Sequence, residues 1–219
     1  MQKTEIVIVR HGESLANLNR IMIGQTDIDL SERGREQARL TAEFLRDEHF
    51  DAIYSSDLVR AYNTAVPNAK IHNLPIIKDE GLRETYVGDW EYVTFDHLVE
   101  NDIERYKMWR EHFGTMVFPG GESTYGSGMR FYDTVLKIAK ENLGRRILIT
   151  SHAGVLRAFW GVISGFSAED MGDAFKFATN ASASYLYFDG ERFVPERYSV
   201  NEHLESVGFV VPGGIPTKQ

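Results

Sequence analysis

The sequence contains no cysteine, which excludes two kinds of site. A chain without thiols can form neither a disulfide framework nor a zinc site built from thiolates. It also lacks an apolar run of about 20 residues, the length that a membrane-spanning helix needs. The apolar run at residues 6–9 is too short for a signal peptide and fits a strand better. We therefore expect a cytoplasmic protein with no membrane partner.

Positive charge is in deficit, because 24 lysines and arginines face 32 aspartates and glutamates. General nucleic-acid binders usually carry a basic surface, so we expect no nucleic-acid partner. A small anionic substrate is still compatible with the net charge of −8, since a local arginine cluster can override a distant negative surface. The 219 residues suffice for one sizeable core, and we expect one domain over residues 1–219.

Apolar runs alternate with amphipathic stretches along most of the chain. Strands are predicted at residues 4–9, 51–56, 76–78, 145–151, 182–188 and 192–198. Helices are predicted from a cap at Ser31 to about Glu48, over 57–65 with a disturbance near Pro67, and over 154–164. The last two strands flank Asp189-Gly190, which favours a hairpin at one sheet edge. This alternation predicts an α/β fold with a doubly wound, mostly parallel sheet and helices on both faces.

Residues 86–132 fit the alternation badly, because they show two helical patterns and no clear strand. They are rich in aromatics, among them Trp90, Trp109 and Phe118. We interpret the segment as a helical insertion over the sheet edge or the active site. Most of its aromatics are expected to form the core of a helical subdomain. The stretch 204–219 is rich in glycine and proline, and we expect a flexible tail there.

Three predicted strands end in polar residues directly before a helix. The first ends at Arg10-His11, the second has Arg60 in the following helix, and the third is followed by His152. The carboxyl ends of parallel strands form the ligand crevice of such sheets, so these four side chains should lie close together. Arginine forks and helix N-termini both suit phosphate oxygens. The pattern predicts a site for a phosphoryl group.

A histidine within such a cluster could also react. Neutral imidazole is a nucleophile, and neighbouring arginines disfavour its protonation. Fixed cations stabilise the negative charge of a phosphoryl transition state. Glu84 lies in a glycine-flanked loop and could protonate the leaving group. Each residue alone is more often structural, and His49, His72, His97, His112 and His203, which lack such neighbours, are assigned to the surface.

Several motifs in order resemble the histidine phosphatase superfamily, also called the phosphoglycerate mutase-like family. They are "RHGESLANLNR" followed by "GQTDIDLSERGREQA", then "YSSDLVRAYNTA", "LRETYVGDWE", "PGGES" and "SHAG". The resemblance runs from about Glu5 to Phe188, nearly the whole chain. "RHG" alone would be a weak signal, whereas this ordered set is highly specific. It implies a phosphoglycerate mutase-like fold.

The resemblance also implies roles for individual residues. His11 would become phosphorylated, Arg10, Arg60 and His152 would complete the phosphate pocket, and Glu84 would be the proton donor and later the base. Asn17 would contact the phosphoryl group, Gln25 and Thr26 would face the substrate, and Ala153 would offer a backbone donor. Hydrolysis in the family needs no metal ion and no organic cofactor. Asn63 and Tyr92 depart from the common glutamine and glycine, which puts fine substrate assignment in doubt.

Three functions remain open at this point. The favoured one is a phosphatase of small phosphomonoesters that acts through a phosphohistidine, with a small phosphorylated metabolite as its substrate. A cofactor-dependent phosphoglycerate mutase is the alternative, although residues 83–89 (RETYVGD) lack the Glu-Arg-His-Tyr-Gly segment and the basic stretch of such enzymes. A non-catalytic phosphate-binding scaffold ranks last, because all five core residues are present. The composition of 86–132 favours a moderately apolar or neutral leaving group, and an exposed sheet edge could support a homodimer.

Overall fold

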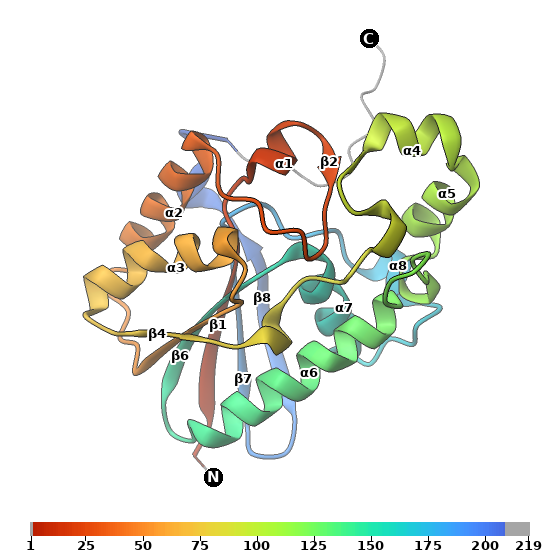
Figure 1. Cartoon of the computed structure of the whole chain (residues 1–219). Helices are drawn as coiled ribbons and strands as arrows, with labels where there is room; N and C mark the ends of the chain where they lie inside the picture. The colour runs from red at the N-terminus through yellow and green to blue at the C-terminus, as the bar shows by residue number, and fades with distance from the viewer. Residues whose placement is uncertain (1, 209–219) are drawn as a thin grey trace.

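The computed structural model describes residues 2–208, which fold around a central six-stranded sheet (Figure 1). Its strand order is β4-β3-β6-β1-β7-β8. The strands are β1 (Thr4–Arg10), β3 (Ala52–Ser55), β4 (Ile76–Lys78), β6 (Arg146–Ser151), β7 (Ala183–Phe188) and β8 (Phe193–Val200). The first four in spatial order are parallel, and β7 and β8 join through antiparallel pairing. The predicted mostly parallel sheet with an edge hairpin is therefore confirmed.

Helices cover both faces of this sheet. They are α1 (Leu15–Leu18), α2 (Glu32–Phe44), α3 (Val59–His72), α4 (Phe95–Asn101), α5 (Ile103–Glu111), α6 (Thr124–Glu141), α7 (Ala153–Ile163) and α8 (Met171–Ala174). Short 3-10 turns lie at η1 (Glu80–Leu82), η2 (Gly88–Trp90), η3 (Phe113–Thr115) and η4 (Glu202–Leu204). The pair α2 and α3 packs on one face, and the pair α6 and α7 packs on the other. No helix within residues 2–208 is long and apolar enough to cross a membrane.

The two faces explain why β1 is apolar along its whole length. Ile6 and Ile8 join the core cluster that contains Phe131 of α6 and other residues of α6 and α7. Val7 and Val9, which alternate with them, join the cluster on the α2 and α3 face. A central parallel strand is buried on both sides, so it shows no polar alternation. Arg10 at its end is the first charged side chain after Glu5.

Two predicted helix boundaries differ from the structure. Ser31 caps α2 as expected, since its Oγ accepts a hydrogen bond from Gly34 N, but the helix ends at Phe44 rather than near Glu48. The helix predicted over 57–65, with a disturbance near Pro67, runs instead as α3 from Val59 through Pro67 to His72. Proline removes one backbone donor from a helix. The buried face of α3, which extends past Pro67 to Asn68, keeps the helix intact through its packing.

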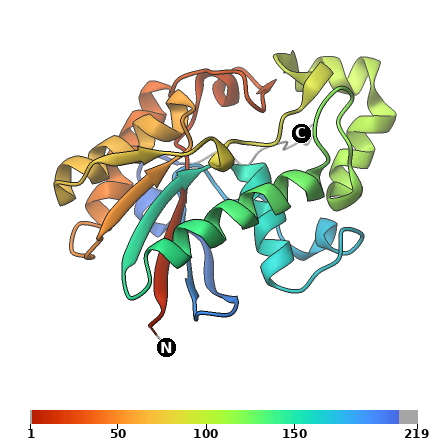
Figure 2. The ribbon, with the colours of Figure 1, turned by 60° about the horizontal axis from the view of Figure 1, so that its bottom comes forward.

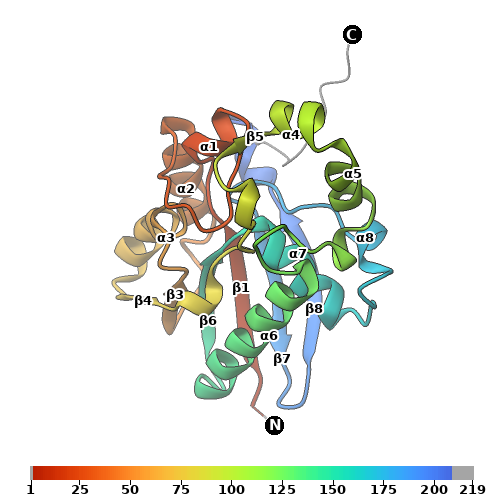
Figure 3. The same cartoon turned by 45° about the vertical axis from the view of Figure 1, so that its right-hand side comes forward.

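The segment 86–123 contains the two expected helices, α4 and α5. The sequence shows no clear strand in this segment, whereas the structure contains β5 (Val93–Thr94), which pairs with β2 (Ile21–Met22). A strand of two residues is too short to show a period. The segment lies at the end of the molecule opposite the N-terminus, near the carboxyl end of β1 (Figures 1 and 3), and extends beyond α6 in the view of Figure 2. The last nine residues of the predicted insertion belong to α6.

The predicted flexible tail can be compared with the structure only as far as Gly208. Leu204 is fully buried, and the carbonyl of Gly208 accepts a hydrogen bond from Gln37 Nε2 at 2.8 Å. The start of the predicted tail is thus packed against α2. Residues 209–219 lie outside the described residues.

Candidate active site

The carboxyl end of β1 places Arg10 and His11 side by side, and both are almost completely buried. Arg10 Nη1 donates to the carbonyl of Ala178 at 2.6 Å. His11 Nδ1 lies 2.7 Å from the carbonyl oxygen of Gly12, an atom that can only accept. The proton of the neutral imidazole therefore sits on Nδ1, and Nε2 keeps its lone pair. His11 lines a pocket at this end of the sheet.

Gly12 is required by a close approach of the backbone. A Cβ at this position would lie 2.4 Å from the carbonyl oxygen of Gly34 in α2. Its backbone N–H donates to Thr64 Oγ1 of α3 at 3.0 Å. The turn after β1 is thus held between two helices, which fixes the direction of the His11 ring.

The surroundings of His11 keep it neutral. Burial lowers the pKa of His11 well below 6.5, and the charges of Arg60 and Arg10 lower it further. Burial also lowers the pKa of Arg10 and of Arg60 to about 10, so both guanidinium groups remain cations near neutral pH. Arg10, His11 and Arg60 together form what we call the cationic end of the pocket.

Arg60 comes from the first turn of α3, as predicted, and its side chain is buried. Its guanidinium donates to the carbonyl of Gly24 at 2.6 Å and to that of Thr26 at 3.0 Å. These contacts hold the guanidinium in place in the wall of the pocket. The positive charge at this end comes from arginines, and residues 2–208 contain no group of three or more histidines, aspartates and glutamates placed to hold a metal ion.

His152 follows β6 and precedes α7, and its ring centroid lies 5.2 Å from that of His11. Its Nε2 pairs with Ser56 Oγ at 2.9 Å, and its buried Nδ1 has no hydrogen-bond partner within residues 2–208. Burial lowers the pKa of His152 well below 6.5, followed by the effects of Arg60 and His11. Ala153, the next residue, lines the pocket, whereas His152 does not line it and neighbours the pocket-lining His11 through its ring.

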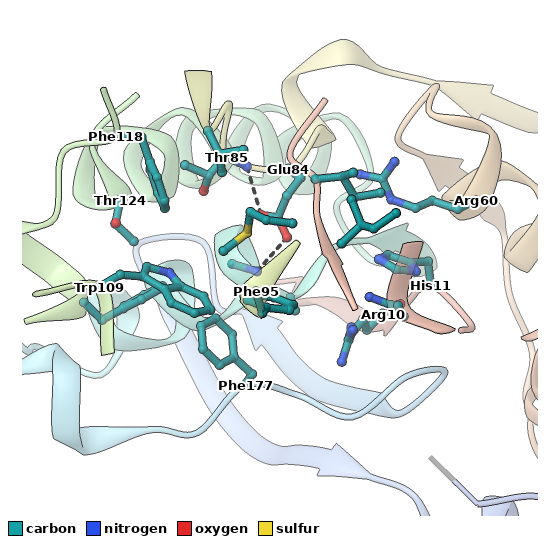
Figure 4. Close-up of a pocket in the computed structure, with 18 residues that line it drawn as sticks. Arg10, His11, Arg60, Glu84, Thr85, Phe95, Trp109, Phe118, Thr124 and Phe177 are labelled. Carbon is teal, nitrogen blue, oxygen red and sulfur yellow. Dashed lines mark hydrogen bonds between the residues drawn. The ribbon is translucent and has the colours of Figure 1, made fainter. Parts of the chain in front are cut away.

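Glu84 reaches into the pocket from the loop after η1, between the cationic end and the aromatic side chains of the other end (Figure 4). Its Oε2 accepts from Gly154 N at 2.8 Å, and its Oε1 accepts from Val155 N and Thr85 N at 2.9 Å each. Two of these donors belong to the first turn of α7, where the helix dipole favours negative charge. A Cβ on Gly154 would lie 2.6 Å from Oε1, so the approach depends on glycine.

Arg130 of α6 holds the Glu84 loop in place. Its guanidinium donates to the carbonyls of Gly81, Arg83 and Glu84 at 2.9–3.1 Å, and it forms a bidentate pair with Glu122. Sequence reasoning did not identify Arg130, because one arginine on an amphipathic helix resembles a solvated surface residue. The "PGGES" motif supplies its partner Glu122.

Asn17, Gln25 and Thr26 are the other residues predicted to contact the substrate, and of these three only Asn17 lines the pocket. Asn17 lines the pocket, and its Oδ1 accepts hydrogen bonds from Asn180 Nδ2 and Ser14 N, which leaves its amide nitrogen for a ligand. Gln25 and Thr26 do not line the pocket. The hydroxyl of Thr26 donates to the Glu91 carboxylate at 2.6 Å, and Gln25 Nε2 donates to the carbonyl of Glu84 at 3.2 Å. Both residues shape the loop beside Arg60 instead of facing the pocket.

The far end of the pocket is apolar. We call its five rings the aromatic wall: Phe95, Trp109, Phe113, Phe118 and Phe177. Ile21, Met22, Ile23 and Val87 add further apolar side chains to the pocket lining. Figure 4 shows Trp109, Phe118 and Phe177 on one side of the pocket and Arg10, His11 and Arg60 on the other. Sequence analysis assigned most of the aromatics to a core, and several of them, including Trp109 and Phe113, are both buried and pocket-lining.

The arrangement combines an uncharged imidazole, two buried cations that match phosphoryl oxygens, and a carboxyl group in the same pocket. Comparison with known proteins agrees with this chemistry. The model of the histidine phosphatase superfamily (branch 1) matches residues 6–201. A metal-independent phosphoserine phosphatase of Arabidopsis thaliana is 34% identical over 213 residues, 96% of this chain and 87% of that protein.

Further relatives cover similar lengths. Phosphoserine phosphatase 1 of Hydrogenobacter thermophilus is 32% identical over 91% of this chain and 94% of its own. The solved structure of Bacillus stearothermophilus YhfR superposes with a TM-score of 0.87 at 27% identity, over 92% of this chain and all of that one. The chain therefore belongs to the histidine phosphatase superfamily.

Proposed function

We propose that this protein is a phosphatase that hydrolyses small phosphomonoesters through a phosphohistidine at His11, without a metal ion. The observation that carries the proposal is the state of His11. Its Nδ1–H is fixed on the Gly12 carbonyl, which leaves Nε2 with its lone pair, and its ring lies between the buried side chains of Arg10 and Arg60 (Figure 4). Membership of a superfamily with phosphatase-named relatives supports phosphomonoester hydrolysis.

The first step transfers the phosphoryl group to the enzyme. His11 Nε2 attacks phosphorus, the bond from phosphorus to the ester oxygen breaks, and Glu84 gives its proton to the departing alkoxide. Arg10 and Arg60 bind the equatorial oxygens, where the transition state carries its negative charge. The N–H groups of Gly154 and Val155 donate hydrogen bonds to the carboxylate that then remains on Glu84.

The second step reverses these roles with water. Glu84 takes a proton from a water molecule, whose oxygen attacks the phosphohistidine. The bond between phosphorus and Nε2 breaks, which restores neutral His11 and releases inorganic phosphate. His152, whose ring neighbours that of His11, has a buried Nδ1 that we assign to a phosphoryl oxygen.

A mutase would use the same first step and then return the phosphoryl group to a bound glycerate. That function requires a cation that holds the glycerate carboxylate while it turns in the site. The pocket beyond Glu84 is lined by apolar side chains and rings. We therefore favour hydrolysis over transfer.

The proposal is tested by phosphate release from phenyl phosphate in the presence of EDTA. The natural protein should release phosphate, and His11→Ala should release none. His97→Ala is a matched control, because His97 is exposed on α4 and lies outside the pocket. Turnover that survives in His11→Ala, or that stops on addition of EDTA to the natural protein, would contradict the proposal.

A further inference from the structure

We infer that the alcohol part of the substrate is uncharged and largely apolar, and that it binds against the aromatic wall. This inference rests on the proposed function and names the substrate class for the same site. It separates this protein from phosphatases whose substrate carries a carboxylate or an ammonium group next to the ester. Four observations about the pocket carry it.

The first observation is the distribution of charge. The ionisable side chains that line the pocket are Arg10, His11, Arg60 and Glu84, all of which the proposed reaction uses. The remaining lining residues carry no charge. An amino acid or a glycerate would bring a carboxylate beyond Glu84 and leave it without a cation. Burying an unpaired carboxylate is strongly unfavourable.

The second observation concerns the hydroxyl groups near the aromatic wall. Thr85 Oγ1 pairs with Ser127 Oγ at 2.7 Å, and Thr124 Oγ1 donates to the carbonyl of Met116 at 3.2 Å. Both threonines line the pocket, yet the structure already uses their hydroxyls. What they offer a ligand is therefore mainly their methyl groups, so the polar groups of a hydrophilic alcohol gain little here.

The third observation is that the aromatic wall is built before any ligand arrives. Phe95 and Trp109 stack with centroids 6.0 Å apart and planes inclined by 16°. The ring centroid of Phe177 lies 5.7 Å from that of Trp109 and 5.3 Å from that of Phe113, which it meets edge to face. Rings locked against one another lose little freedom on binding, which favours a flat or bulky apolar partner.

The fourth observation argues against a cationic alcohol, which aromatic rings would otherwise attract. The guanidinium carbon of Arg157 lies 4.1 Å from the ring centroid of Phe113 and 4.6 Å from that of Phe177. Arg157 does not line the pocket, so it offers no direct contact to a carboxylate there. Its charge next to two of the five rings repels a second cation.

The test compares alkyl phosphates, because they share nearly the same leaving group and differ in apolar size. We expect kcat/KM to rise from ethyl to butyl to hexyl phosphate by about fourfold for each added methylene until the wall is covered. O-phosphoserine and 3-phosphoglycerate should react no faster than ethyl phosphate. The same kcat/KM for all three alkyl phosphates, or O-phosphoserine as the best substrate, would overturn the inference and leave the proposed function intact. No release from any ester, phenyl phosphate included, would overturn both.

Two variants locate the effect. Trp109→Ala should remove the rise of kcat/KM with alkyl chain length. Met108→Ala changes an exposed neighbour on α5 and should leave that rise unchanged. Because Trp109 is buried and its loss could unfold the subdomain, a second variant adds a cation. Ile21→Arg, at a half-buried position that lines the pocket, should raise the ratio of 3-phosphoglycerate to hexyl phosphate turnover at least tenfold. If neither variant changes the substrate ratio, the aromatic wall does not bind the alcohol.

Discussion

Arg60 and Glu91 bind opposite sides of the same short loop. The guanidinium of Arg60 donates to the carbonyls of Gly24 and Thr26. The carboxylate of Glu91 accepts the backbone N–H groups of Gly24, Gln25 and Thr26 at 2.7–3.1 Å, and it accepts the Thr26 hydroxyl as well. Glu91 thus turns three N–H groups to one side, and the carbonyls that orient Arg60 face the other.

Replacement of Glu91 should therefore reduce activity through Arg60. In Glu91→Gln an amide nitrogen would face N–H donors, so the loop would lose its form. We expect kcat/KM to fall about tenfold to a hundredfold, by similar factors for aryl and alkyl phosphates, because Arg60 acts on phosphoryl oxygens and not on the leaving group.

A double-mutant cycle separates this positioning role from general loss of structure. Glu91→Gln should add little to the loss already caused by Arg60→Ala. Additive losses would show that Glu91 acts independently of Arg60. Glu100→Gln, an exposed position on α4, is the control.

Loss of either buried arginine should weaken transition-state binding. Arg10→Ala and Arg60→Ala should each lower kcat/KM by raising its activation free energy by about 2–4 kcal/mol, the contribution of a buried charge-assisted donor. Steady-state kinetics with phenyl phosphate measure the effect. Arg39→Ala, which removes an exposed ion pair with Glu36 on α2, should have no effect on turnover. Losses below threefold at both buried positions would show that they do not bind the phosphoryl group.

The role of Glu84 can be tested by how the loss of rate in a Glu84 variant depends on the leaving group. Glu84→Gln should slow alkyl phosphates far more than aryl phosphates, because a phenolate needs little protonation on departure. The measurement is the first-step rate across phenols and alkanols of different pKa. Glu80→Gln, exposed in η1, serves as the control. If the first-step rate fell by the same factor for all esters, Glu84 would not be the proton donor.

The lowered pKa values of His11 and His152 predict two pH effects. Because His11 stays neutral well below pH 6.5, the acidic limb of kcat/KM for phenyl phosphate should lie below that pH. The unfolded chain takes up protons at these histidines near pH 6.5 and the folded chain does not, so stability should fall as pH decreases from 6.5 toward the lowered values. Above 6.5 the two residues should contribute no pH dependence.

Thermal unfolding of the natural protein and of His152→Ala between pH 7.5 and pH 5 measures the second effect. The variant should lose less stability over this range, because it lacks one buried histidine that must remain neutral. The same slope in both proteins would contradict the lowered pKa of His152.

The cationic end could be predicted from the sequence because the topology brings strand ends together. β1 and β6 are neighbours in parallel register, with Arg10 opposite Ser151, so residues that follow them must meet. Arg60 follows β3, which pairs with β6 on its other side. An apolar run that ends in a charged residue is enough to place such side chains at one sheet edge.

The remaining parts of the site depend on contacts that leave no local pattern. Glu91 binds a loop 65 to 67 residues earlier in the chain, and nothing around it distinguishes it from an exposed carboxylate. The resemblance implies that Gln25 and Thr26 face the substrate; in the structure neither residue lines the pocket, and the backbone N–H groups of both donate to Glu91. Composition likewise cannot tell which rings of the insertion face a pocket, since Trp90 and Trp109 are both buried and only Trp109 lines it.

The most direct test of the account is to trap the covalent intermediate. The natural protein, mixed with phenyl phosphate and quenched within milliseconds in base, should carry one acid-labile phosphoryl group on the peptide that contains His11. Mass spectrometry of His11→Ala should find no such group, and His97→Ala should match the natural protein. A phosphoryl group on another residue, or rapid turnover with no phosphoenzyme and with His11→Ala still active, would contradict the assignment of His11 as the nucleophile.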